Sequence, residues 1–316
     1  MEALIPAGAA GDRVDRVLAQ LFPQYSRARL QLWLEAGFIT VNGQIVDRKA
    51  KLRGGEQIAV QVQPIEADSE WAAQPIALNI VYEDSSIIVV NKPAGLVVHP
   101  AAGNRDGTLV NALLHYAPEL ALVPRAGIVH RLDKDTSGLL VVARGLEAHR
   151  SLVSQLQARS VTREYDALVT GEMIAGGTID APMGRHPGER KKMAVVVGGK
   201  QAITHFRVLE RYRGATLLRV RLETGRTHQI RVHMAHCGYP VVGDPVYGSI
   251  RFLRGIPEET KQTVFALKRQ ALHAARLELR HPQSDKVLHW HVARPSDFEA
   301  VLAALRPFPK EEDEWI

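Results

Sequence analysis

The sequence has 316 residues, with 40 lysines and arginines against 34 aspartates and glutamates, and 46% of its residues are hydrophobic. This length exceeds one typical domain, and the composition is that of a globular protein, which excludes wholesale disorder. The longest apolar runs, such as residues 87–90, fall far short of the ~18 residues that span a bilayer. No basic stretch followed by an apolar core opens the chain, so neither a membrane span nor a signal peptide is expected.

The single cysteine, Cys237, excludes an internal disulfide and is typical of a reducing compartment, so we expect a cytoplasmic protein. The formal net charge is +6, although four of the last six residues are acidic, so the rest of the chain is more basic still. A basic body favours a polyanionic partner, nucleic acid first, while an ordinary solvated surface remains the alternative.

Residues 12–62 predict a small unit of two helices and a sheet. Apolar residues recur at helical spacing over residues 14–22, and Ser26 is a candidate N-cap for a second helix that stops at Gly37. Asn42-Gly43 predicts a hairpin between residues 38–41 and 44–46, and a further strand is expected over residues 57–62.

Basic side chains gather at two places in this unit. Arg27 and Arg29 open the second helix, and Lys49, Lys51 and Arg53 follow the hairpin. A helix N-terminus attracts phosphate, and arginines beside it strengthen that attraction. The stretch YSRARL followed by ITVNG resembles the S4 RNA-binding domain, which implies that these five residues contact RNA. The alternative is a structural domain with ordinary surface cations.

The sequence divides into three parts. Residues 12–75 form the S4-like domain and an acidic, proline-punctuated linker, residues 76–310 form a large domain, and residues 311–316 are an acidic tail. In the large domain one helix is expected over residues 108–116, and strands are expected over residues 80–82, 87–90, 96–98, 128–129, 139–143, 164–169, 202–207, 217–223 and 271–279. This pattern predicts an α+β class with a largely antiparallel sheet, and no phosphate-binding glycine loop is present.

The most informative segment is residues 127–143, where two apolar stretches flank a polar turn that contains Asp133. A carboxylate on a loop between strands of a rigid sheet is well placed for chemistry, although the same residues also make an ordinary turn. Asp135 is a second carboxylate in this turn. A glycosidase-like pair of carboxylates finds little support from a spacing of two residues, so we interpret Asp135 as a turn residue.

Four segments, in order, resemble motifs of the RluA-type pseudouridine synthases. They are NKPAG at residues 91–95, HRLDKDTSGL at 130–139, REY at 163–165, and TGRTHQIRVH at 224–233, the last followed by GDPVYG at 243–248. With the S4-like domain in front, the resemblance covers nearly the whole chain. It implies the pseudouridine synthase fold, a mainly antiparallel mixed sheet flanked by helices.

The resemblance also implies an activity, the conversion of uridine in RNA to its C5-linked isomer without cofactor or metal. Asp133 is then the catalytic aspartate, either as nucleophile or as base in an elimination, and Arg226 is its expected ion-pair partner. Tyr165 is expected to pack on the target base, with or without moving a proton. Arg131 is expected to fill the space of the flipped base, and Lys92 either to contact RNA or only to shape the loop before Pro93.

The subgroup that it most resembles implies uridines in the helix 69 stem-loop of 23S ribosomal RNA as targets, with the large ribosomal subunit or its precursor as partner and the enzyme as a monomer. Other RNA sites, on ribosomal or transfer RNA, remain open. Two other classes are an assembly factor that folds ribosomal RNA with secondary catalysis and an RNA N-glycosidase that uses the same carboxylate.

Three histidines and the cysteine lie within ten residues of one another, at His228, His233, His236 and Cys237. On a helix, His233 and His236 would share a face, but His228 would be rotated away. Structural zinc usually draws its ligands from two separated segments, so no metal site is expected, and Cys237 is interpreted as a packed side chain.

Overall fold

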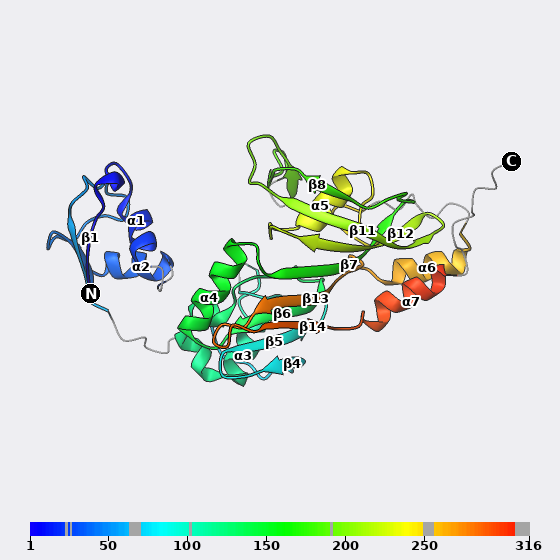
Figure 1. The fold of residues 1–316 in the computed structure, drawn as a ribbon, viewed down its shortest axis with the longest axis horizontal. Helices are drawn as coiled ribbons and strands as arrows, with labels where there is room; N and C mark the ends of the chain where they lie inside the picture. Colours follow the sequence, from blue (N-terminus) through cyan, green and yellow to red (C-terminus); the bar gives the residue numbers. More distant parts are fainter. Residues whose placement is uncertain are drawn as a thin grey trace.

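The computed structural model describes residues 1–22, 25, 27–62, 71–100, 103–189, 192–248 and 256–306, and the side chains of residues 27 and 28 are not considered. These residues form two units, each with its own hydrophobic core (Figure 1). The predicted N-cap Ser26, the linker residues 63–70 and the acidic tail 311–316 lie outside the described residues. Residues 71–75 belong with the large unit, since Trp71 packs against its core and the Asn111 side-chain amide donates to the carbonyl of Ala72.

The small unit is a three-stranded antiparallel sheet packed against two helices. Its strands are β1 (Glu2–Leu4), β2 (Ile39–Val41) and β3 (Gln57–Val60), in the order β1-β3-β2, and its helices are α1 (Val14–Leu21) and α2 (Arg27–Glu35). The helices bury Leu18, Leu30 and Leu34 against Ile58 of the central strand. The two predicted helices and the strand from residue 57 are confirmed, whereas β1 was not predicted.

The predicted hairpin is wrong beyond its turn. Asn42 and Gly43 do adopt positive φ, at 51° and 75°, as such a turn requires. Residues 44–46, however, form no strand, and β2 pairs with β3 instead. The chain after the turn runs back to the start of α1, where Val14 donates its N–H to the carbonyl of Ala50. Within the described residues the turn is therefore closed by one isolated bridge, between Val41 and Gln44.

The large unit is built on a nine-stranded sheet with the order β4-β5-β6-β13-β7-β12-β11-β8 and β14 paired with β13. Among the residues that the structure describes, β6 and β13 are the one pair of strands that runs parallel. A two-stranded sheet of β9 (Met183–Arg185) and β10 (Met193–Val195) lies outside it. The nine strands are β4 (Ile80–Glu83), β5 (Ile87–Lys92), β6 (Ser137–Ala143), β7 (Thr162–Thr170), β8 (Gly177–Asp180), β11 (Ile203–Tyr212), β12 (Ala215–Leu222), β13 (Leu272–Arg280) and β14 (Val287–His291).

Helices cover both faces of the central strands. Along β5, Ile88 and Val90 join the main core, whereas Ile87 and Val89 join a second cluster that contains Leu152 of α4. This alternation is the period of two of a strand whose two faces are both buried. The helices of the large unit are α3 (Leu109–Tyr116), α4 (Leu146–Gln157), α5 (Gln229–His236), α6 (Glu258–Ala266) and α7 (Ser296–Leu305). Short 3-10 helices lie at Pro118–Leu122 and Pro124–Gly127 in this unit and at Ala7–Ala9 in the small unit.

The α+β class and the largely antiparallel sheet are confirmed, but two predicted strands are absent from the described residues. Residues 96–98 instead supply carbonyls for the first N–H groups of α3, since Leu109 and Val110 donate to Val97 and Val98. Ile128 forms only one isolated bridge, with Val142. Within the described part of the chain, no helix combines the length and apolarity needed to cross a membrane.

Candidate active site

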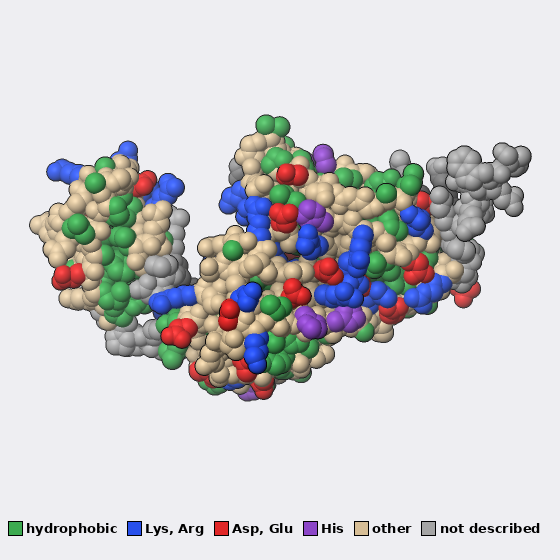
Figure 2. Space-filling view, in the orientation of Figure 1, with side chains coloured by type: hydrophobic (Ala, Val, Ile, Leu, Met, Phe, Trp, Pro, Cys, Tyr) green, Lys and Arg blue, Asp and Glu red, His purple; other side chains and the backbone are tan. Residues whose placement is uncertain are grey.

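A cleft of about 890 Å³ opens in the large unit, between the loop that precedes β6, the start of β7 and the loop that leads into α5. Figure 2 shows a hollow between the upper and lower parts of this unit, with Lys, Arg and His side chains among those along its rim. Four of the predicted site residues line this cleft: Arg131, Asp133, Tyr165 and Arg226. The motifs that carry them lie far apart in the sequence, and the fold brings them together.

The loop that carries Asp133 is held to the sheet at both ends. Before the aspartate, His130 accepts the N–H of Val141 on its Nε2 atom at 3.1 Å. After it, the N–H of Thr136 donates to the Asp133 carbonyl, which closes a turn. Gly138 then enters β6 at φ 112°, where a Cβ atom would lie 2.3 Å from the carbonyl oxygen of Ala274 in the parallel neighbour β13. Only glycine allows this approach, so the glycine of the motif sets where the loop ends.

Lys92 is buried beneath this loop and is inaccessible to RNA, so its predicted contact with RNA is wrong. Its side chain is fully buried, and its ammonium group donates to the carbonyls of Pro93, Leu96 and Lys134 at 2.8–2.9 Å. Burial lowers the pKa of Lys92 to about 7. Lys92 therefore ties the NKPAG segment to the turn that presents Asp133.

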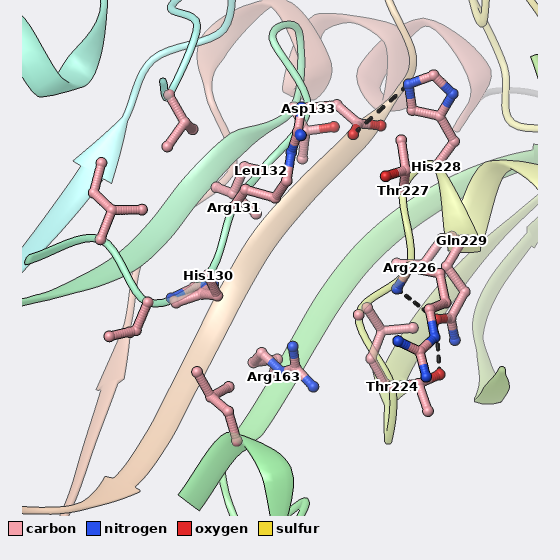
Figure 3. A pocket seen from close by; sticks show the side chains of 18 of the residues that line it. His130, Arg131, Leu132, Asp133, Arg163, Thr224, Arg226, Thr227, His228 and Gln229 are labelled. Carbon is pink, nitrogen blue, oxygen red and sulfur yellow. Dashed lines mark hydrogen bonds and ion pairs between the residues drawn. The ribbon is translucent and has the colours of Figure 1, made fainter. Parts of the chain in front are cut away.

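The cation that pairs with Asp133 is Arg231, not Arg226. Arg231 Nη1 lies 3.0 Å from Asp133 Oδ2, and the Arg231 side chain is only 5% exposed. Arg226 lies in the exposed loop before α5, where its Nε donates to the carbonyl of Gln201 and its N–H to Gln229 (Figure 3). Both arginines belong to the same motif, but only Arg231 is on the helix, in the first turn, where its side chain is buried.

Arg231 is itself held by a second carboxylate. Its Nε and Nη2 atoms donate to the two oxygens of Asp244 at 2.6 and 2.8 Å. Burial would raise the pKa of Asp244, but the hydrogen bonds from Arg231 and from the N–H groups of Val246 and Tyr247 lower it. The Tyr247 ring centre lies 5.1 Å from the guanidinium carbon of Arg231. The GDPVYG motif thus fixes the arginine that faces Asp133.

His228 approaches the other oxygen of Asp133. Its Nε2 atom lies 4.0 Å from Asp133 Oδ1, and its Nδ1 atom lies 2.9 Å from the hydroxyl of Tyr247 (Figure 3). Burial lowers the pKa of His228, which Asp133 only partly offsets, so the ring is neutral at neutral pH. The backbone of His228 has φ 58°, an uncommon conformation for a residue other than glycine.

The floor of the cleft is formed by β7. Tyr165 is 6% exposed, and burial raises the pKa of its hydroxyl. Arg163, two residues earlier on the same face of the strand, is 7% exposed, and within the described residues its Nε has no hydrogen-bond partner. Burial and the nearby Arg163 charge lower the pKa of His130 to about 3, so this ring is neutral.

Sequence reasoning missed five residues of this site: His228 and Arg231 beside Asp133, Asp244 and Tyr247 behind them, and Arg163 on the floor. All five lie inside or next to the recognised motifs, which was the only signal for them. Choosing among the several cations of a motif requires the direction of each side chain, and that is set by where the helix begins.

The histidine-rich segment forms helix α5 and its preceding turn. Both ring nitrogens of His233 are within hydrogen-bond distance of protein atoms, the Thr204 hydroxyl and the Ala181 carbonyl. Among the described residues, no group of three His, Cys, Asp or Glu side chains is arranged to hold a metal ion. Cys237 is exposed, so its predicted packing is wrong, because it follows the end of α5, where residues 236–238 are exposed.

The predicted RNA contacts of the small unit stay predictions. Helix α2 begins at Arg27, and Arg29 in its first turn is half-buried. Lys49, Lys51 and Arg53 are exposed in the segment between β2 and β3.

Both units match known protein families. The family model described as RNA pseudouridylate synthase matches residues 86–236, and the S4 domain model matches residues 12–58. The ribosomal large subunit pseudouridine synthase D of Pseudomonas aeruginosa is 55% identical over 96% of this chain and 95% of its own length. The protein of the same name from Escherichia coli K12 is 51% identical over 100% of this chain and 98% of its own length.

Two solved human structures are similar to this chain. RNA pseudouridylate synthase domain containing 4 is 25% identical with a TM-score of 0.57, covering 72% of this chain and 93% of its own. RNA pseudouridylate synthase domain containing 1 is 26% identical with a TM-score of 0.54, covering 80% and 100%. Motif order, the shared fold and more than half of the residues identical over nearly the full length lead to one assignment: the chain belongs to the RNA pseudouridylate synthase family, carries an S4 domain, and is an RNA pseudouridine synthase.

Proposed function

We propose that this enzyme isomerises uridines of large-subunit ribosomal RNA, in the helix 69 stem-loop, and that Asp133 is the group that acts on the ribose. The observation that carries the catalytic assignment is the Asp133 carboxylate in the cleft, with a buried arginine 3.0 Å from one of its oxygens. The names of the relatives, pseudouridine synthases of the large ribosomal subunit, support the substrate.

The chemistry explains why Asp133 needs Arg231. When the bond between uracil and ribose breaks, positive charge develops on the sugar, and an ionised carboxylate beside it acts as nucleophile or as base. Arg231 fixes the orientation of the Asp133 carboxylate by a charged hydrogen bond. Because Asp244 holds Arg231 from the other side, the pair does not depend on RNA for its geometry.

The remaining residues of the cleft bind the flipped nucleotide. Tyr165 packs on the target base, and its raised pKa keeps the hydroxyl protonated at neutral pH, which favours packing over a role as base. Arg131 is exposed beside the cleft and enters the space that the base leaves in the RNA stack. Arg226 and the exposed cations of the small unit contact phosphates, which carry most of the affinity for RNA.

The test is to map pseudouridine in ribosomal RNA from cells that lack the protein and from the same cells supplied with wild type or Asp133→Asn. We expect the helix 69 modifications to disappear, to return with the wild type and to stay absent with the variant. Modified sites elsewhere would change the target. Restoration by Asp133→Asn would remove Asp133 from the mechanism.

A purified assay separates catalysis from ribosome assembly. In a single turnover on a uridine-containing stem-loop, Asp133→Asn should bind RNA as the wild type does and form product at least 10³-fold more slowly, a loss typical of a catalytic nucleophile or base. An assembly factor would bind the stem-loop without converting it, and an RNA N-glycosidase would release free uracil.

A further inference from the structure

One oxygen of Asp133 has no hydrogen bond within the described residues. Arg231 donates to Oδ2, whereas Oδ1 faces Nε2 of His228 across 4.0 Å, too far for a direct hydrogen bond. Both side chains reach the cleft, with exposed fractions of 16% for Asp133 and 23% for His228. The gap between the two atoms is therefore open to a ligand.

The hydrogen bonds around His228 decide which ring nitrogen carries the proton. The hydroxyl of Tyr247 accepts the N–H of Met193 at 2.9 Å, so its own proton is free to point at Nδ1 of His228, also at 2.9 Å. Nδ1 then acts as acceptor, and in a neutral ring the proton lies on Nε2. His228 thus presents an N–H donor, and Asp133 an acceptor, to the same space.

The backbone of His228 indicates that this arrangement is specific. The residue adopts a left-handed conformation, φ 58° and ψ 21°, at the N-cap of α5 without capping the helix by its side chain. Such strain in a residue with a side chain persists where the surroundings impose it, and it often accompanies function. Here the strain directs the imidazole toward the catalytic aspartate instead of toward the helix end (Figure 3).

We propose that His228 and Asp133 together bind the 2′-hydroxyl group of the target ribose, which accepts a hydrogen bond from His228 Nε2–H and donates one to Asp133 Oδ1. This inference rests on the proposed role of Asp133. A single oxygen about 2.8 Å from each atom spans the 4.0 Å gap at an angle near 90°, within the range of a hydroxyl. The bridge places the carboxylate beside C1′ and C2′, where the glycosidic bond breaks.

Other groups of RNA fit this gap less well. A phosphate oxygen has no proton for the carboxylate and would repel it, and a uracil carbonyl likewise only accepts. The uracil N3–H only donates, so it would leave the His228 N–H unpaired. The 2′-hydroxyl group both donates and accepts, and it is the group by which proteins distinguish RNA from DNA. The pair therefore acts as a positioning and specificity device for ribose.

The test is a cycle of two substrates and four proteins. Stem-loops with uridine or 2′-deoxyuridine at the target position are converted in single turnovers by wild type, by Tyr247→Phe, and by two variants of His228, His228→Leu and His228→Gln. The two variants carry the same backbone strain and have similar side-chain lengths, but only glutamine offers an N–H near the position of Nε2. The ratio of the two rates with the leucine variant serves as the intrinsic ratio, the effect of removing a hydroxyl that only Asp133 still contacts.

We expect the wild type to favour the ribose substrate about tenfold or more over this intrinsic ratio, and His228→Gln to keep part of that preference. Tyr247→Phe removes the hydroxyl that hydrogen-bonds Nδ1 of His228, so the proton of the ring is no longer held on Nε2, and this variant should also lose part of the preference for ribose. Equal ratios for wild type and His228→Leu, with melting temperatures that show both are folded, would overturn the proposal. If the leucine variant does not fold, equal ratios for wild type, His228→Gln and Tyr247→Phe would do the same. A wild type that leaves the uridine stem-loop unconverted would instead count against the proposed function.

Discussion

Basic residues in the two units of this protein lie in opposite environments. In the small unit Lys49, Lys51 and Arg53 are exposed, whereas in the large unit Lys92 and Arg231 are buried with defined partners. An exposed cation attracts a polyanion at little cost, and salt screens that attraction. A buried cation pays a desolvation penalty, so it is retained where it fixes other groups. The exposed cations of the small unit are therefore candidates for the attraction of RNA, whereas these two buried cations of the large unit fix the geometry of other groups.

The largest effect is expected when two arginines of one motif, Arg231 and Arg226, are replaced in turn. Replacing Arg231 by methionine leaves the Asp133 and Asp244 carboxylates without their shared cation, and removing one partner of a buried ion pair costs about 3–5 kcal/mol of unfolding free energy. We expect this loss in urea denaturation and a fall in kcat of about 10²–10³-fold, as when a donor that orients a reacting charge is removed.

Arg226→Met is the matched control for that experiment. Its guanidinium is exposed and donates only to the Gln201 carbonyl among the described residues, so stability should change by less than about 0.5 kcal/mol and the loss should appear in KM. Equal losses of kcat in the two variants would contradict the assignment of Arg231 as the partner of Asp133.

A smaller effect is expected from Lys92, and it depends on pH. The folded protein holds the pKa of Lys92 near 7, well below its ordinary value of 10.5, so below pH 7 both folded and unfolded chains carry the proton. Between pH 7 and 10.5 only the unfolded chain keeps it, and stability therefore rises with pH. The unfolding free energy of the wild type relative to Lys92→Met should increase by about 1–3 kcal/mol from pH 6.5 to 9.5.

Urea denaturation of both proteins at the two pH values measures this difference, because other titrating groups are common to both and cancel. A difference that stays constant would mean that the three carbonyls around the ammonium group keep it charged in the folded state.

The sequence was sufficient for the class, for seven of the nine strands of the large sheet and for the loop that carries Asp133, for physical reasons. Alternating β-branched residues specify strands, and the turn residues around Asp133 specify a loop between them. These signals are local. After Asn42-Gly43 the turn formed as predicted, but the pairing stops at the bridge between Val41 and Gln44, and β2 takes its sheet partner, β3, from a segment distant in sequence.

The partner of Asp133 was beyond local reasoning. Arg226 and Arg231 are equally basic and five residues apart, and the helix that begins at Gln229 turns only Arg231 into the interior. Lys92 was expected to contact RNA because the NKPAG segment resembles a motif of the family, and only the fold reveals three carbonyls converging on its ammonium group.

The smallest expected effect comes from the exposed side of the comparison. Replacing Lys49, Lys51 and Arg53 together by alanine should leave kcat at saturating RNA and thermal stability unchanged, since these side chains are exposed. Each lost phosphate contact lowers the slope of log K against log salt by about 0.7–0.9, so the triple variant should lose about 2 from that slope and bind more weakly at low salt. The matched control replaces three exposed basic residues that do not line the cleft, Arg276, Arg280 and Lys286, and should keep the wild-type slope. Equal slopes for the two triple variants would mean that the small unit does not bind RNA through these cations. The cations that attract RNA would then be sought in the large unit, which also holds those that orient Asp133.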